Sequence, residues 1–293
     1  MLIGQFWGTS AAEGIPSPFC RCENCQQARR EKGKYQRKRS SFRVSDSIII
    51  DLGADAVTQS MEYGELTDIN HVLITHTHED HLNQHMLMEA FWGNEYRKGP
   101  IHYYLTEDAY NIIDKWRSND WILKGMVPNW EANNIVQFHK LSYGQRIEVD
   151  GIFVTPFKGN HKGNMKETSA MYLLEFQDGR TLFYGLDSGP YFQETIEALK
   201  NVYVNIYISE ATGGTRPSAP ESTHMNLQGV YDLMCTLFEQ GTIDQNSILY
   251  LTHINHRTGH DQMEEGVQRL NFPVKTVVAY DGLVIFDARH GAR

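Results

Sequence analysis

The stretch Thr75-His76-Thr77-His78-Glu79-Asp80-His81 holds three imidazoles and an aspartate within six positions. It follows the run 71–74, which is typical of a short buried strand, and precedes residues 82–89, which are typical of a helix start. The donors therefore lie at a strand-to-helix turn, where side chains two residues apart can face one point. Nitrogen and oxygen donors of this kind suit zinc, manganese or iron, so the stretch predicts a metal site.

The composition limits the class of protein. The chain has 293 residues, a hydrophobic fraction of 41% and a formal net charge of −9. This length suits one large α/β domain with a sizeable core, and the negative charge argues against nonspecific coating of nucleic acid. No apolar run approaches the ~20 residues of a membrane helix. The N-terminus lacks the features of a signal peptide, so a cytoplasmic location is expected.

The cysteines point to a second kind of site. Three of the four cysteines are packed into residues 20–25, as Cys20, Cys22 and Cys25. Cysteines this close cannot all pair with one another, and a structural zinc knuckle fits them better. Three thiolates leave one tetrahedral position open, so a histidine from elsewhere in the chain is expected as the fourth ligand. The alternative is a cluster of free thiols.

Strands and helices alternate along the chain. Apolar and alternating runs predict strands at 2–7, 41–44, 47–51, 71–74, 101–105, 135–138, 145–149, 153–157, 169–176, 181–184, 203–208, 247–251, 275–279 and 283–286. Helical patterns occupy 23–31, 57–63, 106–117, 191–200 and 225–239. Turn signals at 150–151 and 177–180 make the middle of the chain an antiparallel meander. We therefore expect residues 1–293 to form a single α/β domain with two sheets packed face to face.

Three features leave alternatives open. The basic run 32–39 is either a solvated face or a rim that attracts phosphates. Asp51 ends a buried strand, where it either hydrogen-bonds the metal-binding loop or caps the following turn. The aromatic-rich segment 84–134 either walls a substrate pocket, forms a subunit contact or packs in the core.

Three later strand ends carry further donors. His161, Asp187 and His253 each stand where a predicted apolar strand emerges, which repeats the arrangement of the opening stretch. Strand ends at a sheet edge are common places for binding sites. Together with the opening stretch they give five histidines and two aspartates. That number of donors fits two metal ions that share one carboxylate.

The order of these donors resembles that of the metallo-β-lactamase superfamily. The resemblance implies an αββα sandwich, with two mixed sheets packed face to face and helices outside. It implies that His76, His78 and His161 bind one metal, that Asp80, His81 and His253 bind the other, and that Asp187 lies between them. An aspartate at 187, rather than a cysteine, points away from the antibiotic-hydrolysing members and toward the phosphodiesterase, thioesterase and glyoxalase-like branches.

Further segments resemble the phosphoribosyl cyclic phosphate phosphodiesterase branch. They are Gly8-Thr9-Ser10, Gly14-Ile15-Pro16, the cysteine knuckle with Gln26-Gln27-Ala28-Arg29-Arg30, and Leu251-Thr252-His253-Ile254-Asn255-His256. In that branch a histidine three residues after the last catalytic ligand closes the knuckle, and here that residue is His256. His224 matches a branch histidine near the substrate phosphate. Its alternative is a solvent-facing histidine at a helix start.

The resemblance implies hydrolysis of a small cyclic or nucleotide-like phosphodiester by a hydroxide that two divalent metals, Mn or Zn, activate. Asp80 and His224 are the candidate catalytic residues, with His224 donating to the leaving oxygen. We expect one structural zinc, a small-molecule substrate, a homodimer, and neither a membrane nor a nucleic-acid partner. The alternatives are a tRNA-processing endonuclease, a glyoxalase-like thioesterase and a non-catalytic metal-binding protein. The remaining histidines are assigned no ligand role: His71, His85, His102, His139, His260 and His290.

Overall fold

Two β-sheets form the centre of the molecule. The computed structural model describes residues 2–93, 95, 97–119, 130–218 and 222–286, so His290 and Trp121 lie outside the described residues. The first sheet has six strands in chain order: β1 (Leu2–Gly8), β2 (Ser41–Ser45), β3 (Ile48–Ile50), β4 (His71–Leu73), β5 (Ile101–Thr106) and β6 (Val136–Leu141). Its first three strands are antiparallel, and β3 to β6 are parallel.

The second sheet has seven strands in the order β13-β12-β11-β10-β9-β8-β7. They are β7 (Ile147–Val149), β8 (Ile152–Lys162), β9 (Thr168–Glu175), β10 (Thr181–Gly185), β11 (Ile206–Glu210), β12 (Ile248–Thr252) and β13 (Lys275–Val278). β7 to β10 form the predicted antiparallel meander, and β10 to β13 are parallel. Both sheets are therefore mixed.

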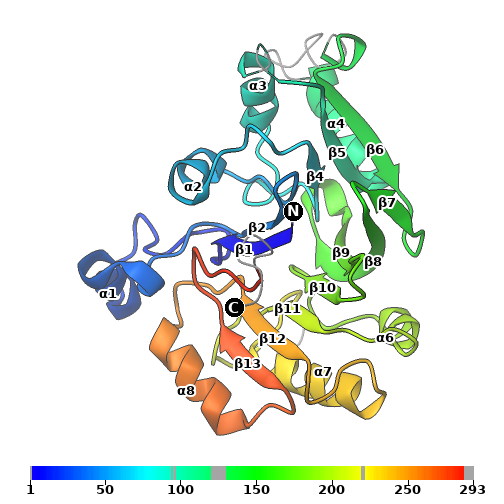
Figure 1. Cartoon of the computed structure of the whole chain (residues 1–293). Coiled ribbons are helices and arrows are strands. Elements are labelled where there is room, and N and C mark those ends of the chain that lie inside the picture. The colour runs from blue at the N-terminus through cyan, green and yellow to red at the C-terminus, as the bar shows by residue number, and fades with distance from the viewer. Residues whose placement is uncertain (1, 94, 96, 120–129, 219–221, 287–293) are drawn as a thin grey trace, which may run out of the picture.

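Helices lie outside the two sheets, with α1 set apart at the left of Figure 1. They are α1 (Glu23–Glu31), α2 (Ala56–Tyr63), α3 (His85–Trp92), α4 (Glu107–Asn119), α6 (Gln193–Leu199), α7 (Leu227–Glu239) and α8 (His260–Leu270). In Figure 1, α3 and α4 lie beside the first sheet, and α7 and α8 lie beside β11 to β13 of the second. No helix among the described residues is long and apolar enough to cross a membrane.

Alternation along the strands produces three apolar layers. In β3, Ile48 and Ile50 face the second sheet, whereas Ile49 faces the helices α2 to α4. A third layer packs β12 against α7 and α8. Burying one large apolar side chain contributes roughly 1.5–3 kcal/mol, so these layers hold the strand ends in fixed positions. The predicted αββα sandwich is confirmed.

Three details differ from the sequence-based predictions. Residues 135–138 do not join the meander: β6 extends the first sheet parallel to β5, because α4 carries the chain across between them. Residues 283–286 form only an isolated bridge at Val284 rather than a strand. The helix α8 was not predicted, since it is mostly polar and buries only His260, Met263 and Gly266. That residues 1–293 form a single domain stays a prediction.

Candidate metal centre

One edge of the sandwich collects the candidate donors. The opening motif follows β4, Asp187 follows β10 and His253 follows β12, so these side chains leave the carboxyl ends of their strands. His161 differs from its prediction, because β8 does not end at Phe157. The strand continues to Lys162 with a register shift after Lys158, and His161 is one of its last residues.

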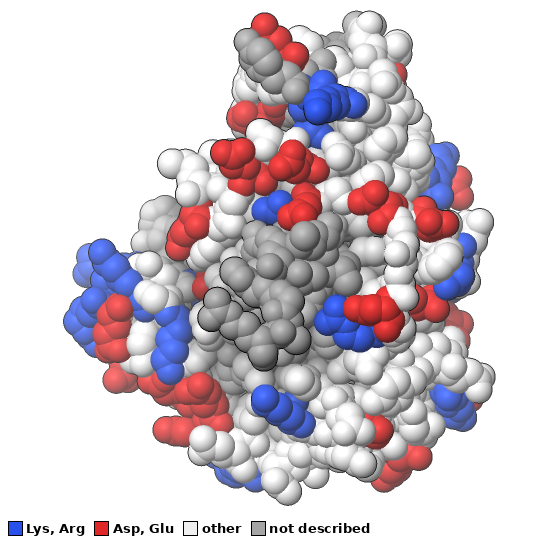
Figure 2. Space-filling model, in the orientation of Figure 1, with Lys and Arg blue, Asp and Glu red and all other residues white. Residues whose placement is uncertain are grey.

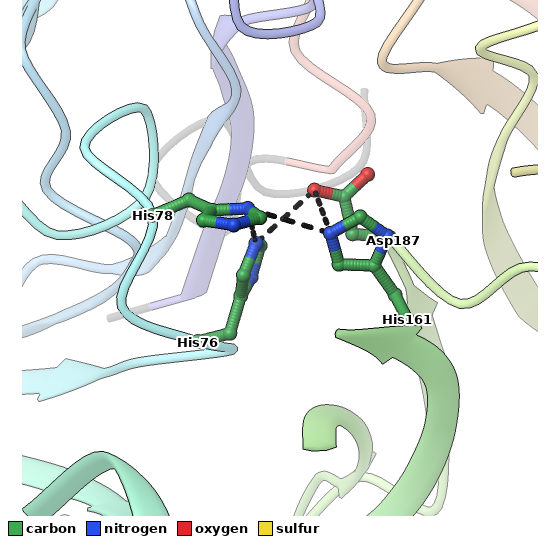
Figure 3. Close-up of side chains that lie close together, drawn as sticks. All are labelled: His76, His78, His161 and Asp187. Atoms are coloured by element: carbon green, nitrogen blue, oxygen red, sulfur yellow. Dashed lines mark hydrogen bonds and ion pairs between the residues drawn. The ribbon is translucent and has the colours of Figure 1, made fainter. Parts of the chain in front are cut away.

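The first donor group consists of His76, His78, His161 and Asp187, whose ligand atoms all lie within 4.8 Å of one another. Figure 3 shows three imidazoles and a carboxylate that converge on a common point. The Nε2 atom of His76 lies 2.9 Å from Nδ1 of His78 and 3.3 Å from Oδ2 of Asp187. The Nε2 atom of His161 lies 3.4 Å from Nδ1 of His78. Nitrogen atoms this close surround a space that suits one metal ion.

The second donor group consists of Asp80, His81, Asp187 and His253, with ligand atoms again within 4.8 Å. Nε2 of His81 lies 3.0 Å from Oδ2 of Asp187 and 3.2 Å from Oδ2 of Asp80. Oδ1 of Asp187 lies 3.2 Å from Nδ1 of His253. Asp187 thus belongs to both groups, as a shared carboxylate would.

Asp51 orients His81. Its Oδ2 atom lies 2.6 Å from Nδ1 of His81, and its carboxylate accepts hydrogen bonds from the backbone N–H and the hydroxyl of Thr75 at 2.8 and 2.9 Å. Metal-binding histidines typically donate their other ring N–H to a carboxylate in this way. Of the two roles considered for Asp51, the geometry therefore favours holding the metal-binding loop.

Several buried atoms at the centre have no hydrogen-bond partner among the described residues. They include Nε2 of His81, Nε2 of His253 and Oδ1 of Asp187. Because Nδ1–H of His81 donates a hydrogen bond to Asp51, Nε2 of that ring carries the lone pair and faces the carboxylates of Asp80 and Asp187. Burying such atoms without compensation is costly, and a divalent cation satisfies all of them at once. The residues present therefore fit two metal ions.

Three residues at this edge have left-handed backbones. The φ angles of Asp51, Asp187 and His253 are 62°, 43° and 55°. For residues other than glycine, this conformation costs about 1–3 kcal/mol each and persists only where surrounding contacts enforce it. Each residue lies one or two positions after a buried strand, where the turn directs the side chain toward the shared site.

Glu210 is a residue that the sequence analysis missed. It ends β11, is fully buried, and accepts hydrogen bonds from the backbone N–H groups of residues 188–189 at 2.9 and 2.7 Å. Its Oε2 atom accepts a 2.6 Å bond from the hydroxyl of Thr212, which lies 2.8 Å from Nδ1 of His253. The chain Glu210–Thr212–His253 therefore fixes the orientation of the His253 ring. An acid at the end of a buried strand, the signal that singled out Asp51, was available here too.

His224 lies beside the donor groups, with a partly exposed side chain. Its Nδ1 atom lies 3.1 Å from Oε2 of Glu210 and 3.3 Å from Oδ1 of Asp187, and its ring centroid lies 4.7 Å from that of His161. Burial lowers the pKa of His224, but hydrogen bonds and charges from the two carboxylates outweigh this and raise it to about 11. Without metal ions at the site, His224 is therefore protonated at neutral pH.

Glu167 was also missed, and no sequence signal pointed to it. It is 2% exposed and accepts hydrogen bonds from the backbone N–H and the hydroxyl of Thr77, the residue between His76 and His78. Asn164 donates to the carbonyl of Thr77. Residues 163–167 therefore hydrogen-bond both the backbone N–H and the carbonyl of Thr77, which fixes the spacing of the two histidines.

Replacing Glu167 by glutamine is expected to change how stability depends on pH. Burial raises the pKa of Glu167 from 4.5 to about 7. Because this pKa is higher in the folded than in the unfolded protein, Glu167 contributes to the free energy of unfolding fully below about pH 4.5, and this contribution is lost as the pH rises through 7. A neutral glutamine avoids the loss. The stability of the metal-free variant should therefore rise relative to wild type between about pH 5 and pH 8, by up to about 3 kcal/mol.

Urea denaturation at about pH 5 and at about pH 8 measures this change in the free energy of unfolding. The variant Glu194→Gln, on the exposed side of α6, is the matched control and should leave the pH dependence as it is in wild type. Equal stability differences between Glu167→Gln and wild type at the two pH values would contradict the prediction.

The cysteine knuckle brings three thiols together. The sulfur atoms of Cys20, Cys22 and Cys25 lie within 4.8 Å of one another, and His256 is not a member of that group. Its backbone carbonyl lies 3.8 Å from Sγ of Cys22, while its Nδ1 atom lies 2.7 Å from Oε1 of Glu13. A carboxylate on Nδ1 is the partner that a ligating histidine commonly has. That His256 completes the knuckle stays a prediction.

The basic run 32–39 is mostly exposed or partly exposed but largely paired within the chain, which disfavours the phosphate-attracting rim. Four of its five cations have partners within the chain. Lys34, Lys38 and Arg39 form ion pairs with Asp261, Glu62 and Asp55, respectively. Arg37 donates a hydrogen bond to the backbone carbonyl of Ala279. On the face shown in Figure 2, basic and acidic side chains of the described residues are interspersed, without a broad basic patch.

The aromatic-rich segment serves two roles. Trp130 is buried and stacks on Phe91 with ring centroids 5.5 Å apart, which is core packing. Trp116, in contrast, lines a cleft together with His78, Asp80 and Asn164. One aromatic side chain of this segment therefore lines the same cleft as two of the candidate donors.

Comparisons with known proteins identify the family and the fold. A model of the beta-lactamase superfamily domain matches residues 47–270, and no curated protein sequence matches the chain. A solved diphosphatase from the PhnP family shares 19% identity, with 97% of this chain and 96% of that chain covered and a TM-score of 0.69. Zinc-bound PqqB from Methylobacterium extorquens shares 16% identity, with 98% and 100% covered and a TM-score of 0.70. The short form of human tRNase Z shares 19%, with 97% and 99% covered and a TM-score of 0.62.

Proposed function

The chain belongs to the beta-lactamase superfamily, and from this premise we propose that it is a metal-dependent hydrolase of small phosphodiesters. The observation that supports the proposal most is Asp187, which is shared by two groups of donors. Such groups suit two divalent cations, Mn or Zn, that share one carboxylate. When bound, a pair of cations lowers the pKa of water and neutralises charge on a phosphate.

His224 is the proposed proton donor to the leaving oxygen. Glu210 accepts its Nδ1 proton, so Nε2–H of the protonated ring remains to donate. Asp80 serves as a ligand whose Oδ2 atom lies between His81 and His253, at 3.2 and 3.7 Å. The side chains of the protein therefore position the donors, bind the substrate and donate one proton.

The cleft beside the donors supports a small substrate. Trp116 offers an aromatic face, on which a planar ring such as a nucleobase can stack. Among the described residues that line this cleft there is neither lysine nor arginine. Charge on the phosphate is then balanced by the cations and His224, without lysine or arginine, which suits a singly charged diester better than a polyanion. Together with the paired basic run, this disfavours the tRNA-processing alternative.

The PhnP-family diphosphatase and the tRNase Z among the similar structures support phosphate-ester chemistry in general, and the proposal narrows it to small diesters. The structural zinc at the knuckle with His256 as fourth ligand, a homodimer and a cytoplasmic location are parts of the same proposal.

Bis-para-nitrophenyl phosphate is the first substrate to test. We expect release of nitrophenol by protein loaded with Mn²⁺ or Zn²⁺, and none after treatment with a chelator. Elemental analysis should find two catalytic metal ions and one knuckle zinc per chain. A cyclic ribose phosphate, a glutathione thioester and a precursor tRNA separate the three enzyme alternatives. No turnover of any diester by the fully loaded protein would favour a non-catalytic metal-binding role.

A further inference from the structure

A second set of histidines lies outside the metal centre, on three adjacent parallel strands of the first sheet (Figure 1). His71 begins β4, His102 is the second residue of β5, and His139 lies in β6. The strand registers place His71 opposite His102 and Tyr104 opposite His139. All three histidines are partly exposed, so an ion from solvent can reach them. The proposed catalytic donors instead follow the opposite, carboxyl end of β4.

Two of these rings point nitrogen atoms at each other. Nδ1 of His102 lies 2.8 Å from Nε2 of His139. The proposed catalytic pair has the same combination of atoms at nearly the same separation, since Nε2 of His76 lies 2.9 Å from Nδ1 of His78. Because metal–imidazole bonds are ~2.0–2.1 Å long, two nitrogen ligands on one ion stand roughly 3 Å apart. The pair therefore already has the separation of two ligands on one ion, and it exchanges the hydrogen bond between the rings for two bonds to the metal.

Both rings are held in place by their neighbours. His71 stacks on His102 with centroids 5.2 Å apart and planes 13° apart, and Tyr104 stacks on His139 at 4.6 Å and 16°. Nδ1 of His71 lies 3.1 Å from the hydroxyl of Tyr104, which ties the two stacks together. Side chains that are already fixed lose little conformational freedom when they bind a ligand.

The charge state of the cluster also suits a cation. Burial lowers the pKa of His71, His102 and His139, so the rings are neutral at pH 7 and keep their lone pairs. The negative charge of Asp150 acts on both His71 and Tyr104.

We propose that His102 and His139 form a separate binding site for a divalent transition-metal ion, with His71 and Tyr104 bracing the two ligands. Imidazole ligands suit Cu²⁺, Ni²⁺ and Zn²⁺, and water fills the remaining positions. This site is independent of the proposed hydrolase activity, because it shares no residue with either catalytic donor group.

Titration with Ni²⁺ tests the proposal on protein that has first been loaded with zinc and dialysed. By calorimetry and elemental analysis, wild type should bind one Ni²⁺ more than the double variant His102→Ala/His139→Ala. The variant His71→Ala should bind this ion about tenfold more weakly, because it loses the bracing ring. His85→Ala is the matched control: this histidine on α3 is exposed and should not contribute. Diester hydrolysis of each folded variant should match wild type, because none of these residues belongs to a catalytic donor group.

The same number of bound Ni²⁺ ions in wild type and in the double variant would overturn the proposal. Imidazole NMR of the wild-type protein gives a second test that does not depend on variants. Substoichiometric Ni²⁺ should broaden the signals of His102 and His139 before those of His85. Broadening of His85 alone, or of all exposed histidines equally, rejects the site even if the double variant does not fold.

Discussion

Replacing Asp187 by alanine is expected to abolish diester hydrolysis and to lower the metal content of the catalytic site. Its two oxygen atoms lie 3.0 Å from His81 and 3.2 Å from His253, and Oδ2 also lies 3.3 Å from His76. The variant therefore loses a ligand from both donor groups at once. Because metals supply several kcal/mol of transition-state stabilisation, we expect turnover to fall by about a thousandfold or more.

Elemental analysis after dialysis, together with the rate of diester hydrolysis, measures the two effects of the Asp187 variant. Asp178→Ala is the matched control, since this aspartate lies exposed in the turn between β9 and β10. The knuckle zinc should remain in both variants, which separates loss of the catalytic metals from unfolding. Full activity of Asp187→Ala with wild-type metal content would refute the assignment of the shared carboxylate.

Replacing His224 by alanine is expected to lower kcat by roughly 10²–10⁴-fold, the range for loss of a general acid, while the metal content stays unchanged. The residue belongs with Asp187, Glu210 and His253 to a third group of close donors, so its role as a ligand must be distinguished from its role as an acid. If the metal content of the variant is unchanged, His224 acts as the acid. If the variant loses one metal ion, His224 is a ligand.

The choice of substrate sharpens the test of His224. A nitrophenolate leaves without help from an acid, whereas an alkoxide needs a proton. The loss of activity should therefore be much smaller with bis-para-nitrophenyl phosphate than with a diester of simple alcohols. Equal losses with both substrates would show that His224 does not donate to the leaving oxygen.

The candidate donors could be predicted because strand ends are visible in a sequence. An apolar run followed by Asp or His marked Asp187 and His253, and the parallel strands β10 and β12 bring these ends to one edge. His161 was marked by the same rule, although its strand continues to Lys162. The residues that orient these donors follow a different rule. Glu167 contacts Thr77 across 90 positions of chain, and neither local pattern predicts the other. Only the fold reveals such partners, because hydrogen bonds between distant loops leave no periodic pattern.

The same reasoning explains the errors in the fold. The strand β6 was assigned to the meander because it directly precedes it in sequence, and sequence alone does not show which sheet receives a strand. The helix α8 was not predicted, because it has a narrow apolar face. The pairing of the basic run 32–39 with Asp55, Glu62 and Asp261 likewise depends on contacts between distant segments.

The loop 163–167 limits how far the substrate preference can be changed by substitution. Asn164 and Met165 line the cleft, so they are natural choices for a library that seeks new substrates. Asn164, however, also donates to the carbonyl of Thr77, and Glu167 binds the N–H of the same residue. Variation at this loop therefore moves two imidazoles along with the cleft wall. A library here will trade selectivity against metal retention, whereas Trp116, on a separate helix, can be varied without that penalty.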